Sequence, residues 1–261
     1  MRYILKGDFN PINADQLTYI DILMKRKNLT KLYLLNSGKN DFFQISIQEY
    51  PFLETIEKKD IEAKETIHEI SSDLAIDYLE GDFTKYNQAF IDYIFQNPQY
   101  LELIVKNKMS KKRFEHSLSV AKTAQKIAIY ANLNQQEAYI SGLLHDICKE
   151  LDRNYEKLIM ERYFKDVIKL NRKIFHQYTG YYFVKEIMRC DNYAILDGIL
   201  HHVNGTSKQP LAMAVFVADK IEPLRGYDTS KEIALYQESL VDCFNYVKAT
   251  QVRYLKENLK K

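Results

Sequence analysis

The chain has 261 residues, of which 46% are hydrophobic and 28% are charged, and it contains only eight glycines and five prolines. This composition excludes a disordered or fibrous protein and is typical of helix-rich globular domains, here one large or two small ones. The formal net charge is +2, so no global field attracts nucleic acid or an anionic membrane. We therefore expect neither a nucleic-acid partner nor a membrane partner.

The cysteines and the first residues bear on the compartment. Cys148, Cys190 and Cys243 are odd in number and form no C-x-x-C pair, so neither a disulfide framework nor a thiolate zinc site is predicted. Charged residues interrupt Met1–Asn10, and no uninterrupted apolar run of about 18 residues follows. A cytoplasmic location is the expectation.

In chain order, the first predicted elements are a strand at Tyr3–Leu5, a helix at about Asp15–Lys27 and a strand at Leu32–Leu35. This order predicts a parallel βαβ unit. In nucleotide-binding folds the loop after the first strand, here Gly7–Asn13, contacts the ligand. Residues 39–66 show no clear period, and we assign no element there.

The pattern becomes helical from Ser71, with one predicted helix ending at Gly81 and another covering Phe90 to Phe95. After Pro98 almost every segment has a helical period, and the only linker candidate is the stretch at 97–100. The sequence thus predicts two domains, a small Rossmann-like α/β domain at residues 1–97 and an all-α domain at residues 98–261.

Five of the six histidines lie in the second of these regions, at helical positions that share a face with apolar or small residues. A single inward histidine is usually a core residue. Burial of several imidazoles together with two carboxylates, however, costs several kcal/mol each unless a partner is present. A metal cluster is the predicted partner. These residues are His116, His145, Asp146, His176, His201, His202 and Asp219.

Mixed imidazole and carboxylate ligands suit iron, manganese or zinc. Adjacent His145 and Asp146 can each bind an ion, and a carboxylate can bridge two ions about 3.5–4 Å apart. A hydroxide held by such a pair is the natural nucleophile for attack on phosphorus. The pattern therefore predicts a metal-dependent phosphohydrolase.

Five motifs resemble, in order and spacing, the YqeK branch of the HD superfamily, which hydrolyses diadenosine tetraphosphate symmetrically to two ADP. They are Arg113-Phe-Glu-His116, Gly142-Leu-Leu-His-Asp-Ile-Cys-Lys149, His176 ahead of Gly180, His202-Val-Asn-Gly205, and Ala218-Asp-Lys-Ile-Glu-Pro223 followed by Arg225. The resemblance covers residues 98–227 and implies an all-helical HD fold.

The resemblance also implies the ligands. One ion would be held by His116, His145, Asp146 and Asp219, and Asp146 would bridge to a second ion held by His176 and His202. Iron is the metal that the resemblance implies. His201 stands where the family usually has another residue, so we expect it outside the ligand set.

Four cationic residues are candidate contacts of a polyphosphate. Lys149 looks like the family's phosphate-contacting lysine, and Arg113, Lys220 and Arg225 add positive charge nearby. Lysines and arginines at helix ends are often only solvated, which is the alternative for each. We also expect Cys148 to be a small buried apolar residue.

The first domain resembles, at Gly7–Leu17, the opening loop of nicotinate-nucleotide adenylyltransferases, in which two histidines bind the nucleotide phosphates. Asn13 and Gln16 stand in their places and carry no positive charge. Ile70-Ser-Ser72 resembles a later motif of that family. The resemblance implies a shortened nucleotidyltransferase remnant that binds a nucleotide, covers the hydrolase site or forms a homodimer.

The substrate stays open at this point. A small nucleotide is expected, with diadenosine tetraphosphate first and dGDP or guanosine tetraphosphate as alternatives at the same site. A nucleotide-sensing protein is the alternative from a different class, and a remaining adenylyltransferase activity is disfavoured by Asn13 and Gln16.

Overall fold

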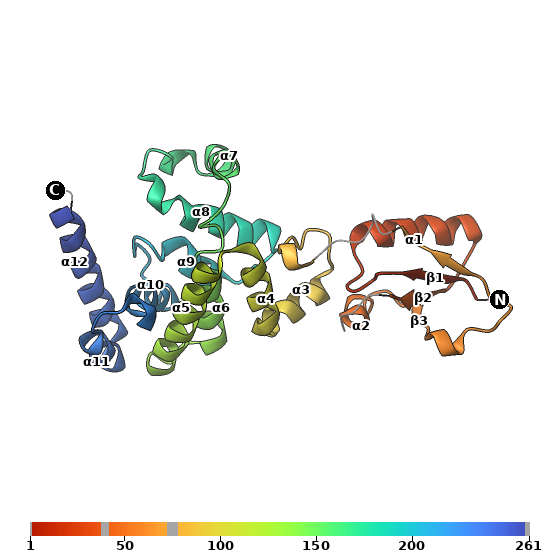
Figure 1. Cartoon of the computed structure of the whole chain (residues 1–261), viewed down its shortest axis with the longest axis horizontal. Coiled ribbons are helices and arrows are strands. Elements are labelled where there is room, and N and C mark those ends of the chain that lie inside the picture. The colour runs from red at the N-terminus through yellow and green to blue at the C-terminus, as the bar shows by residue number, and fades with distance from the viewer. Residues whose placement is uncertain (1, 38–41, 72–77, 259–261) are drawn as a thin grey trace. The chain divides into compact units, whose positions relative to one another are not determined.

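A computed structural model describes residues 2–37, 42–71 and 78–258 of the chain (Figure 1). The chain divides into two compact units, Met1–Asn97 and Pro98–Lys261. Within the described residues, no helix combines the length and the apolar character that a membrane crossing requires.

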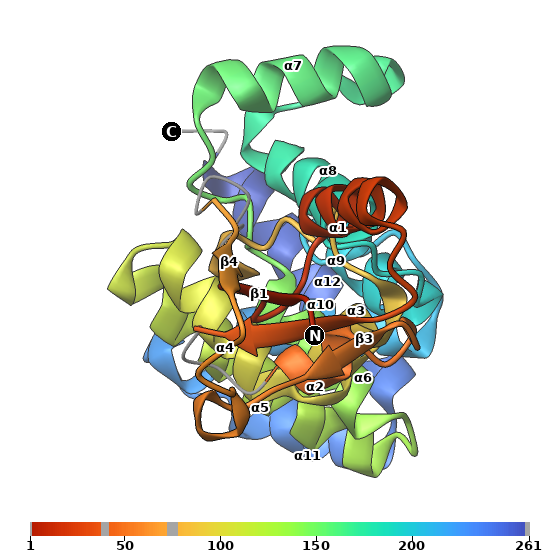
Figure 2. The ribbon, with the colours of Figure 1, turned by 90° about the vertical axis from the view of Figure 1, so that its right-hand side faces the viewer.

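Unit 1 is built on a parallel four-stranded sheet in the order β3-β2-β1-β4. Its strands are β1 (Ile4–Gly7), β2 (Leu32–Asn36), β3 (Leu53–Thr55) and β4 (Ile67–Glu69). Helix α1 (Ala14–Lys27) lies on one face of the sheet and the short helix α2 (Phe43–Ser46) on the other (Figure 2). The βαβ prediction is confirmed, whereas β3 and β4 have only three residues each and were not predicted.

The strand order reverses between β1 and β4, which is where open α/β sheets usually bind ligands. In this unit the loop after β1 is filled by its own side chains, since Phe9 and Ile12 are almost completely buried. A Cβ atom on Gly7 would lie 2.1 Å from Ile70 Cγ2 and about 3 Å from the Phe9 ring. The predicted ligand loop is therefore packed with apolar atoms at its base.

Asn13 and Gln16 have structural partners in this loop. The Asn13 side chain accepts hydrogen bonds from the backbone N–H groups of Asp15 and Gln16. In return, the Gln16 side chain accepts one from the backbone N–H of Asn13. This reciprocal pair caps the N-terminus of α1, so both side chains are committed to the helix.

Unit 1 ends with a 3-10 turn at Tyr78–Glu80 and helix α3 (Gln88–Gln96). The prediction at Phe90–Phe95 is confirmed by α3, whose Phe90, Ile91 and Ile94 are buried. Most of the helix predicted from Ser71 to Gly81, and part of Ile70-Ser-Ser72, lies outside the described residues. The linker predicted at 97–100 is mostly helical, because α4 begins at Pro98.

Unit 2 is helical, as predicted. Helices α5, α6, α9 and α10 pack on one another, α12 and α11 lie against the α10 side, and α8 packs on α9 (Figure 1). The helices are α4 (Pro98–Lys108), α5 (Lys111–Tyr130), α6 (Gln135–Leu144), α7 (Arg153–Tyr163), α8 (Phe175–Tyr182), α9 (Tyr193–His201), α10 (Pro210–Ile221), α11 (Ser230–Glu238) and α12 (Leu240–Asn258).

Helices α5 and α6 approach each other closely. A Cβ atom on Gly142 would lie 2.8 Å from the Cα atom of Ala121 on α5, so only glycine fits this contact without a shift of the backbone. The small residue Gly142 on α6 thus allows the close approach of the two helices. The contact sets the distance between His116 on α5 and His145 at the end of α6.

Helix α8 continues directly into a π-helix at Phe183–Ile187. The Met188 N–H donates to the Phe183 carbonyl, five residues back, and one extra residue is therefore accommodated in the turn. In a regular α-helix Ile187, eleven residues after His176, would share the buried face of His176 and Gly180. Instead Met188 is fully buried and Ile187 is half-buried, since the π-turn moves the inward face by one residue.

Candidate metal centre

The six predicted ligands come from helix ends and helix faces that converge in unit 2. His116 lies on α5, His176 in the first turn of α8 and Asp219 near the end of α10. His145 and Asp146 directly follow α6, and His202 directly follows α9. All are buried except His116, which is half-buried. The structure therefore brings together every residue of the predicted ligand set.

Asp146 lies at the middle of the cluster, and its two carboxylate oxygens face different histidines. Oδ1 is 3.2 Å from His176 Nε2 and 3.5 Å from His202 Nε2. Oδ2 is 3.6 Å from His145 Nε2 and 4.0 Å from His116 Nε2. One carboxylate thus separates two pairs of imidazoles.

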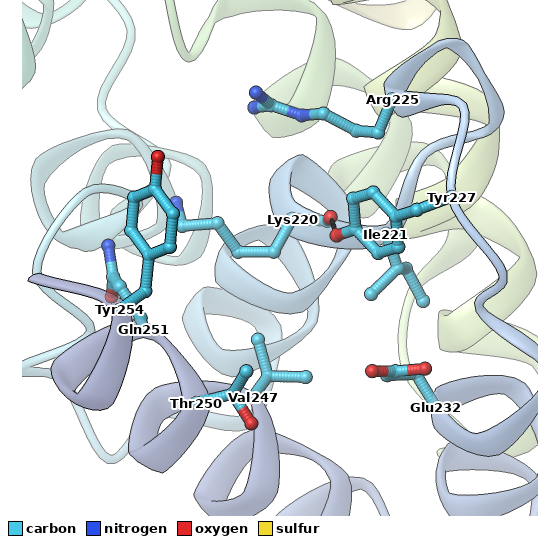
Figure 3. A pocket seen from close by; sticks show the side chains of 9 residues that line it. All are labelled: Lys220, Ile221, Arg225, Tyr227, Glu232, Val247, Thr250, Gln251 and Tyr254. Atoms are coloured by element: carbon cyan, nitrogen blue, oxygen red, sulfur yellow. Dashed lines mark hydrogen bonds between the residues drawn. The ribbon is translucent and has the colours of Figure 1, made fainter. Parts of the chain in front are cut away.

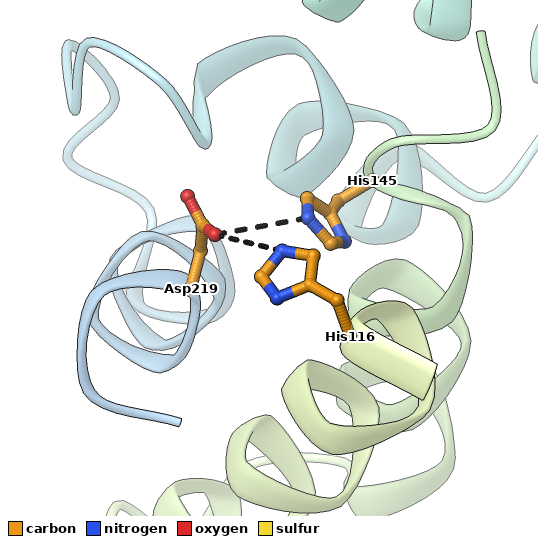
Figure 4. A group of neighbouring side chains, drawn as sticks. All are labelled: His116, His145 and Asp219. Atoms are coloured by element: carbon orange, nitrogen blue, oxygen red, sulfur yellow. Dashed lines mark ion pairs between the residues drawn. The ribbon is translucent and has the colours of Figure 1, made fainter. Parts of the chain in front are cut away.

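Asp219 completes the side of the cluster that holds His116 and His145 (Figure 4). Its Oδ1 atom is 3.2 Å from His116 Nε2 and 3.8 Å from His145 Nε2. The ligand-type atoms of these three residues all lie within 4.8 Å of one another, and so do those of His145, Asp146 and His202. His145 belongs to both groups.

Three of the four imidazoles are oriented by a hydrogen bond at Nδ1. His145 Nδ1 is 2.7 Å from the Gly142 carbonyl, and His202 Nδ1 is 2.7 Å from the Ile199 carbonyl. A carbonyl only accepts, so Nδ1 carries the proton and donates. His116 Nδ1 lies 3.0 Å from Glu222 Oε1. The Nε2 atoms of these rings then face Asp146 and Asp219.

The arrangement fits divalent metal ions. His145 Nε2 is buried, has no hydrogen-bond partner among the described residues, and lies between two carboxylates. Orientation of a ring through Nδ1 with Nε2 free is the usual state of a metal-ligating histidine. Cysteine does not take part, since Cys148 Sγ donates to the Thr179 carbonyl. Imidazole and carboxylate donors of this kind suit iron, manganese or zinc.

The electrostatics of the cluster favour the protonation states that metal ligation requires. Burial lowers the pKa of His145 to about 4 and also lowers the pKa values of His176 and His202, so these rings are neutral at pH 7. Burial alone would raise the pKa of Asp146, but the surrounding imidazoles hold it well below its usual range.

Asp219 and His116 behave as a pair. Burial opposes ionisation of Asp219, but Lys220 and His116 keep the pKa of this carboxyl well below its usual range. Burial also opposes protonation of His116, yet Asp219 and Glu222 raise the pKa of its ring. Because a metal-ligating imidazole must be neutral, protons and metal ions compete for this ring.

Cations surround the two carboxylates. Arg113 Nη1 is 2.7 Å from Asp146 Oδ2, and Lys149 Nζ is 3.9 Å from Oδ1. Lys220 and Arg225 contact Asp219 at 2.6 and 2.7 Å. All four cations predicted as phosphate contacts thus lie at the cluster, and burial lowers the pKa of Lys149.

Two cavities reach the cluster from different directions. One, of about 490 Å³, is lined by Arg113, His116, Glu222 and Arg225, among others. The other, of about 340 Å³, is lined by Lys149, Glu156, Arg172, Lys173 and His176. A ligand can therefore enter beside His116 and beside His176.

His201 lies apart from the cluster, as expected. Its Nε2 is 3.3 Å from Asp197 Oδ1, and its Nδ1 is 2.7 Å from the Thr206 hydroxyl. Cys148 is buried, and burial raises the pKa of its thiol to about 12, which agrees with its expected role as a small apolar residue.

Glu222 is the residue that sequence reasoning missed. It is 2% exposed and orients His116, and its Oε2 accepts from the Leu224 N–H. A carboxylate about one helical turn after Asp219, and so on the same face, was a usable signal. No comparable signal marked Arg172 and Lys173, which follow a poorly periodic stretch.

Comparison with known proteins adds a family. The HD-domain family profile matches residues 113–224, the segment that supplies all six clustered residues. Residues 113–224 are therefore similar to HD domains. The His145-Asp146 pair of this segment stands at the centre of the cluster described above.

The chain is also similar to curated proteins. The chain is 31% identical over 140 residues to a Mycoplasma pneumoniae protein named probable nicotinate-nucleotide adenylyltransferase/Ap4A hydrolase, covering 53% of this chain and 40% of that protein. It is 29% identical to a symmetrical bis(5'-nucleosyl)-tetraphosphatase of Halalkalibacterium halodurans, covering 48% and 68%. The chain thus spans well under half the length of the Mycoplasma protein.

A solved structure has the same fold. A Clostridium acetobutylicum protein, described as a predicted HD superfamily hydrolase involved in NAD metabolism, matches with a TM-score of 0.52 and 23% identity. The match covers 64% of this chain and 87% of that one.

Proposed function

We propose that the chain is a hydrolase that cleaves diadenosine tetraphosphate and related dinucleoside polyphosphates symmetrically. The observation that carries this proposal is Asp146, whose two oxygens face two separate pairs of imidazoles inside a ring of four cations. The similarity to proteins named symmetrical bis(5'-nucleosyl)-tetraphosphatase supports the substrate class.

In this proposal the six clustered residues hold two divalent ions. His116, His145 and Asp219 would hold one ion, His176 and His202 would hold the other, and Asp146 would contribute to both. Bound there, the ions would supply Lewis-acid catalysis toward the phosphoryl oxygens and lower the pKa of a water molecule. We expect iron, with manganese or zinc as alternatives.

The protein's own groups bind and orient the phosphate chain. Arg113 and Lys149 lie on either side of Asp146, and Lys220 and Arg225 lie at Asp219, so negative phosphoryl oxygens meet cations on both sides of the cluster. The two cavities at His116 and His176 leave room for the chain to extend in both directions. This openness favours a long substrate that is cleaved near its middle.

The reaction adds one water molecule across the central P–O–P link. The water oxygen bonds to one phosphorus atom, the bridging oxygen leaves with the other, and two ADP molecules result. Cations at both phosphates stabilise the charge that develops on the oxygens in the transition state.

For unit 1 we infer that adenylyl transfer is lost. Asn13 and Gln16 cap α1 and carry no positive charge, and Phe9 and Ile70 fill the space beside Gly7. A nucleotide contact elsewhere on this unit, or a homodimer, stays a proposal.

The test is turnover of diadenosine tetraphosphate by the full chain after reconstitution with Fe²⁺, Mn²⁺ or Zn²⁺, with products separated by chromatography and dGDP and ATP assayed in parallel. We expect ADP as the sole product. Formation of AMP and ATP would contradict symmetrical cleavage. Release of phosphate from dGDP alone would mean that the same site acts on a mononucleotide. Absence of turnover with all three substrates would favour a nucleotide-sensing protein.

A further inference from the structure

A third cavity, of about 500 Å³, borders the candidate metal centre on the side of α12 (Figure 3). Its volume is within the range of small-molecule sites, about 300–1,000 Å³. It is lined by Lys220, Ile221, Arg225, Tyr227, Glu232, Val247, Thr250, Gln251 and Tyr254. Beyond Lys220 and Arg225, none of these residues has a part in the proposed chemistry.

Two cations connect this cavity to the centre. Lys220 Nζ is 2.6 Å from Asp219 Oδ2, and Arg225 Nη2 is 2.7 Å from Asp219 Oδ1. Arg225 also lines the cavity beside His116. A phosphate held by these two side chains therefore has its next substituent at the mouth of the third cavity.

The remaining lining suits a flat, weakly polar group. Tyr227 and Tyr254 lie on opposite sides of the cavity in Figure 3, with the stem of Lys220 between them. Their side chains are 53% and 64% exposed, whereas Ile221 and Val247 are buried and form an apolar floor. Aromatic rings beside an apolar floor stack on nucleobases.

Two further contacts shape the cavity. The Tyr227 hydroxyl donates to the Lys220 carbonyl, which fixes this ring beside the cation that contacts Asp219. Glu232 places a carboxylate in the lining, and a carboxylate accepts hydrogen bonds from an exocyclic amine. A purine offers both a ring face for the tyrosines and, in adenine, such an amine.

We propose that this cavity is a nucleoside subsite that binds one purine base between Tyr227 and Tyr254, with the attached phosphate at Lys220 and Arg225. The proposal rests on the proposed function for the path of the phosphate chain. In this proposal the residues of α12 determine the affinity for a nucleoside, whereas the cations Lys220 and Arg225 bind the phosphates.

The test uses the full chain and binding of N-methylanthraniloyl-ADP, measured by fluorescence both with EDTA and with Mn²⁺. Tyr254→Ala removes one aromatic face, and Thr250→Trp fills the cavity from an exposed helix position. We expect each to weaken binding about tenfold, a loss in the lower range for one stacking contact. Tyr254→Phe should bind like the unmodified chain, and so should the control Tyr155→Ala, an exposed tyrosine on α7.

Kinetics separate base recognition from phosphate recognition. In Tyr254→Ala the KM for diadenosine tetraphosphate should rise about tenfold, while the KM for inorganic tetrapolyphosphate should not change. Circular dichroism checks that each variant is folded.

The outcomes distinguish the two proposals. If Tyr254→Ala and Thr250→Trp bind the ADP probe as tightly as the unmodified chain, or if the unmodified chain does not bind it, the subsite is wrong even where the dinucleotide is cleaved. If both variants bind the probe more weakly but the unmodified chain does not cleave the dinucleotide, the result supports the nucleoside subsite and contradicts the proposed reaction.

Discussion

The two units both place polar side chains where a strand or helix ends, and the partners of those side chains differ. In unit 1 the Asn13 side chain accepts from the backbone of α1, and the Gln16 side chain bonds to the backbone of Asn13 and Asp8. In unit 2 the backbone engages only one nitrogen of His145 and of His202, and the second nitrogen points at carboxylates.

The difference separates structural polar groups from functional ones. A side chain whose every polar atom has a protein partner stabilises the fold, and its position needs no ligand. A side chain that is fixed through one atom and keeps a second, buried atom without a partner, as His145 does, costs stability unless something binds there. The contrast can be tested from both sides.

The largest effect is expected at Asp146. Asp146→Ala removes the carboxylate that faces both pairs of imidazoles, so we expect loss of metal and of turnover, beyond the roughly 100-fold that loss of a supporting residue costs. Bound metal is measured by mass spectrometry after gel filtration. Hydrolysis is measured with diadenosine tetraphosphate as the substrate. The control is Asp166→Ala, at an exposed position. Full activity in Asp146→Ala would contradict the proposal of a metal-dependent hydrolase.

A smaller effect is expected at Glu222, which contacts His116 Nδ1 but is not one of the six clustered residues. Glu222→Ala frees the ring to rotate, and we expect metal affinity or kcat to fall about 10- to 100-fold. Titration with Mn²⁺ reports the affinity, and Glu238→Ala, an exposed glutamate on α11, is the matched control. An unchanged affinity would mean that packing alone orients His116.

The smallest effect compares one helix cap in each unit. Asn13 caps α1 and Asn192 caps α9, the helix that precedes His202. Asn13→Ala and Asn192→Ala should each cost about 1 kcal/mol in urea unfolding. Only Asn192→Ala should also weaken metal binding. Loss of turnover in Asn13→Ala at full folding would show that unit 1 contributes to the reaction.

Much of the fold was predictable because its signals are local. The helical character of unit 2, the buried face of α5 and the βαβ start follow from the periodicity of apolar residues. Strands β3 and β4 were missed because three residues carry too little pattern. The π-turn was missed because a helical period contains no mark of an inserted residue.

The candidate site was predictable as a set of residues and unpredictable as a geometry. Motif order identified His116, His145 and Asp219, but which oxygen of Asp146 faces which imidazole depends on how four helices pack. The role of Glu222 depends on the same packing, since its partner is 106 positions away in the chain. The cavity at Tyr254 joins α10 to α12, and no sequence motif marks its α12 side.

The π-helix at Phe183–Ile187 has a consequence for the comparison of sequences. One residue in an α-helix turns the chain by about 100°, so a relative with a regular helix here must have one residue fewer to keep both His176 and Met188 inside. A single-residue gap within this segment would then leave both flanking faces in register. Such a gap marks one inserted residue that is accommodated within a single helical turn. Aligned residues before and after the gap then occupy the same positions in both structures.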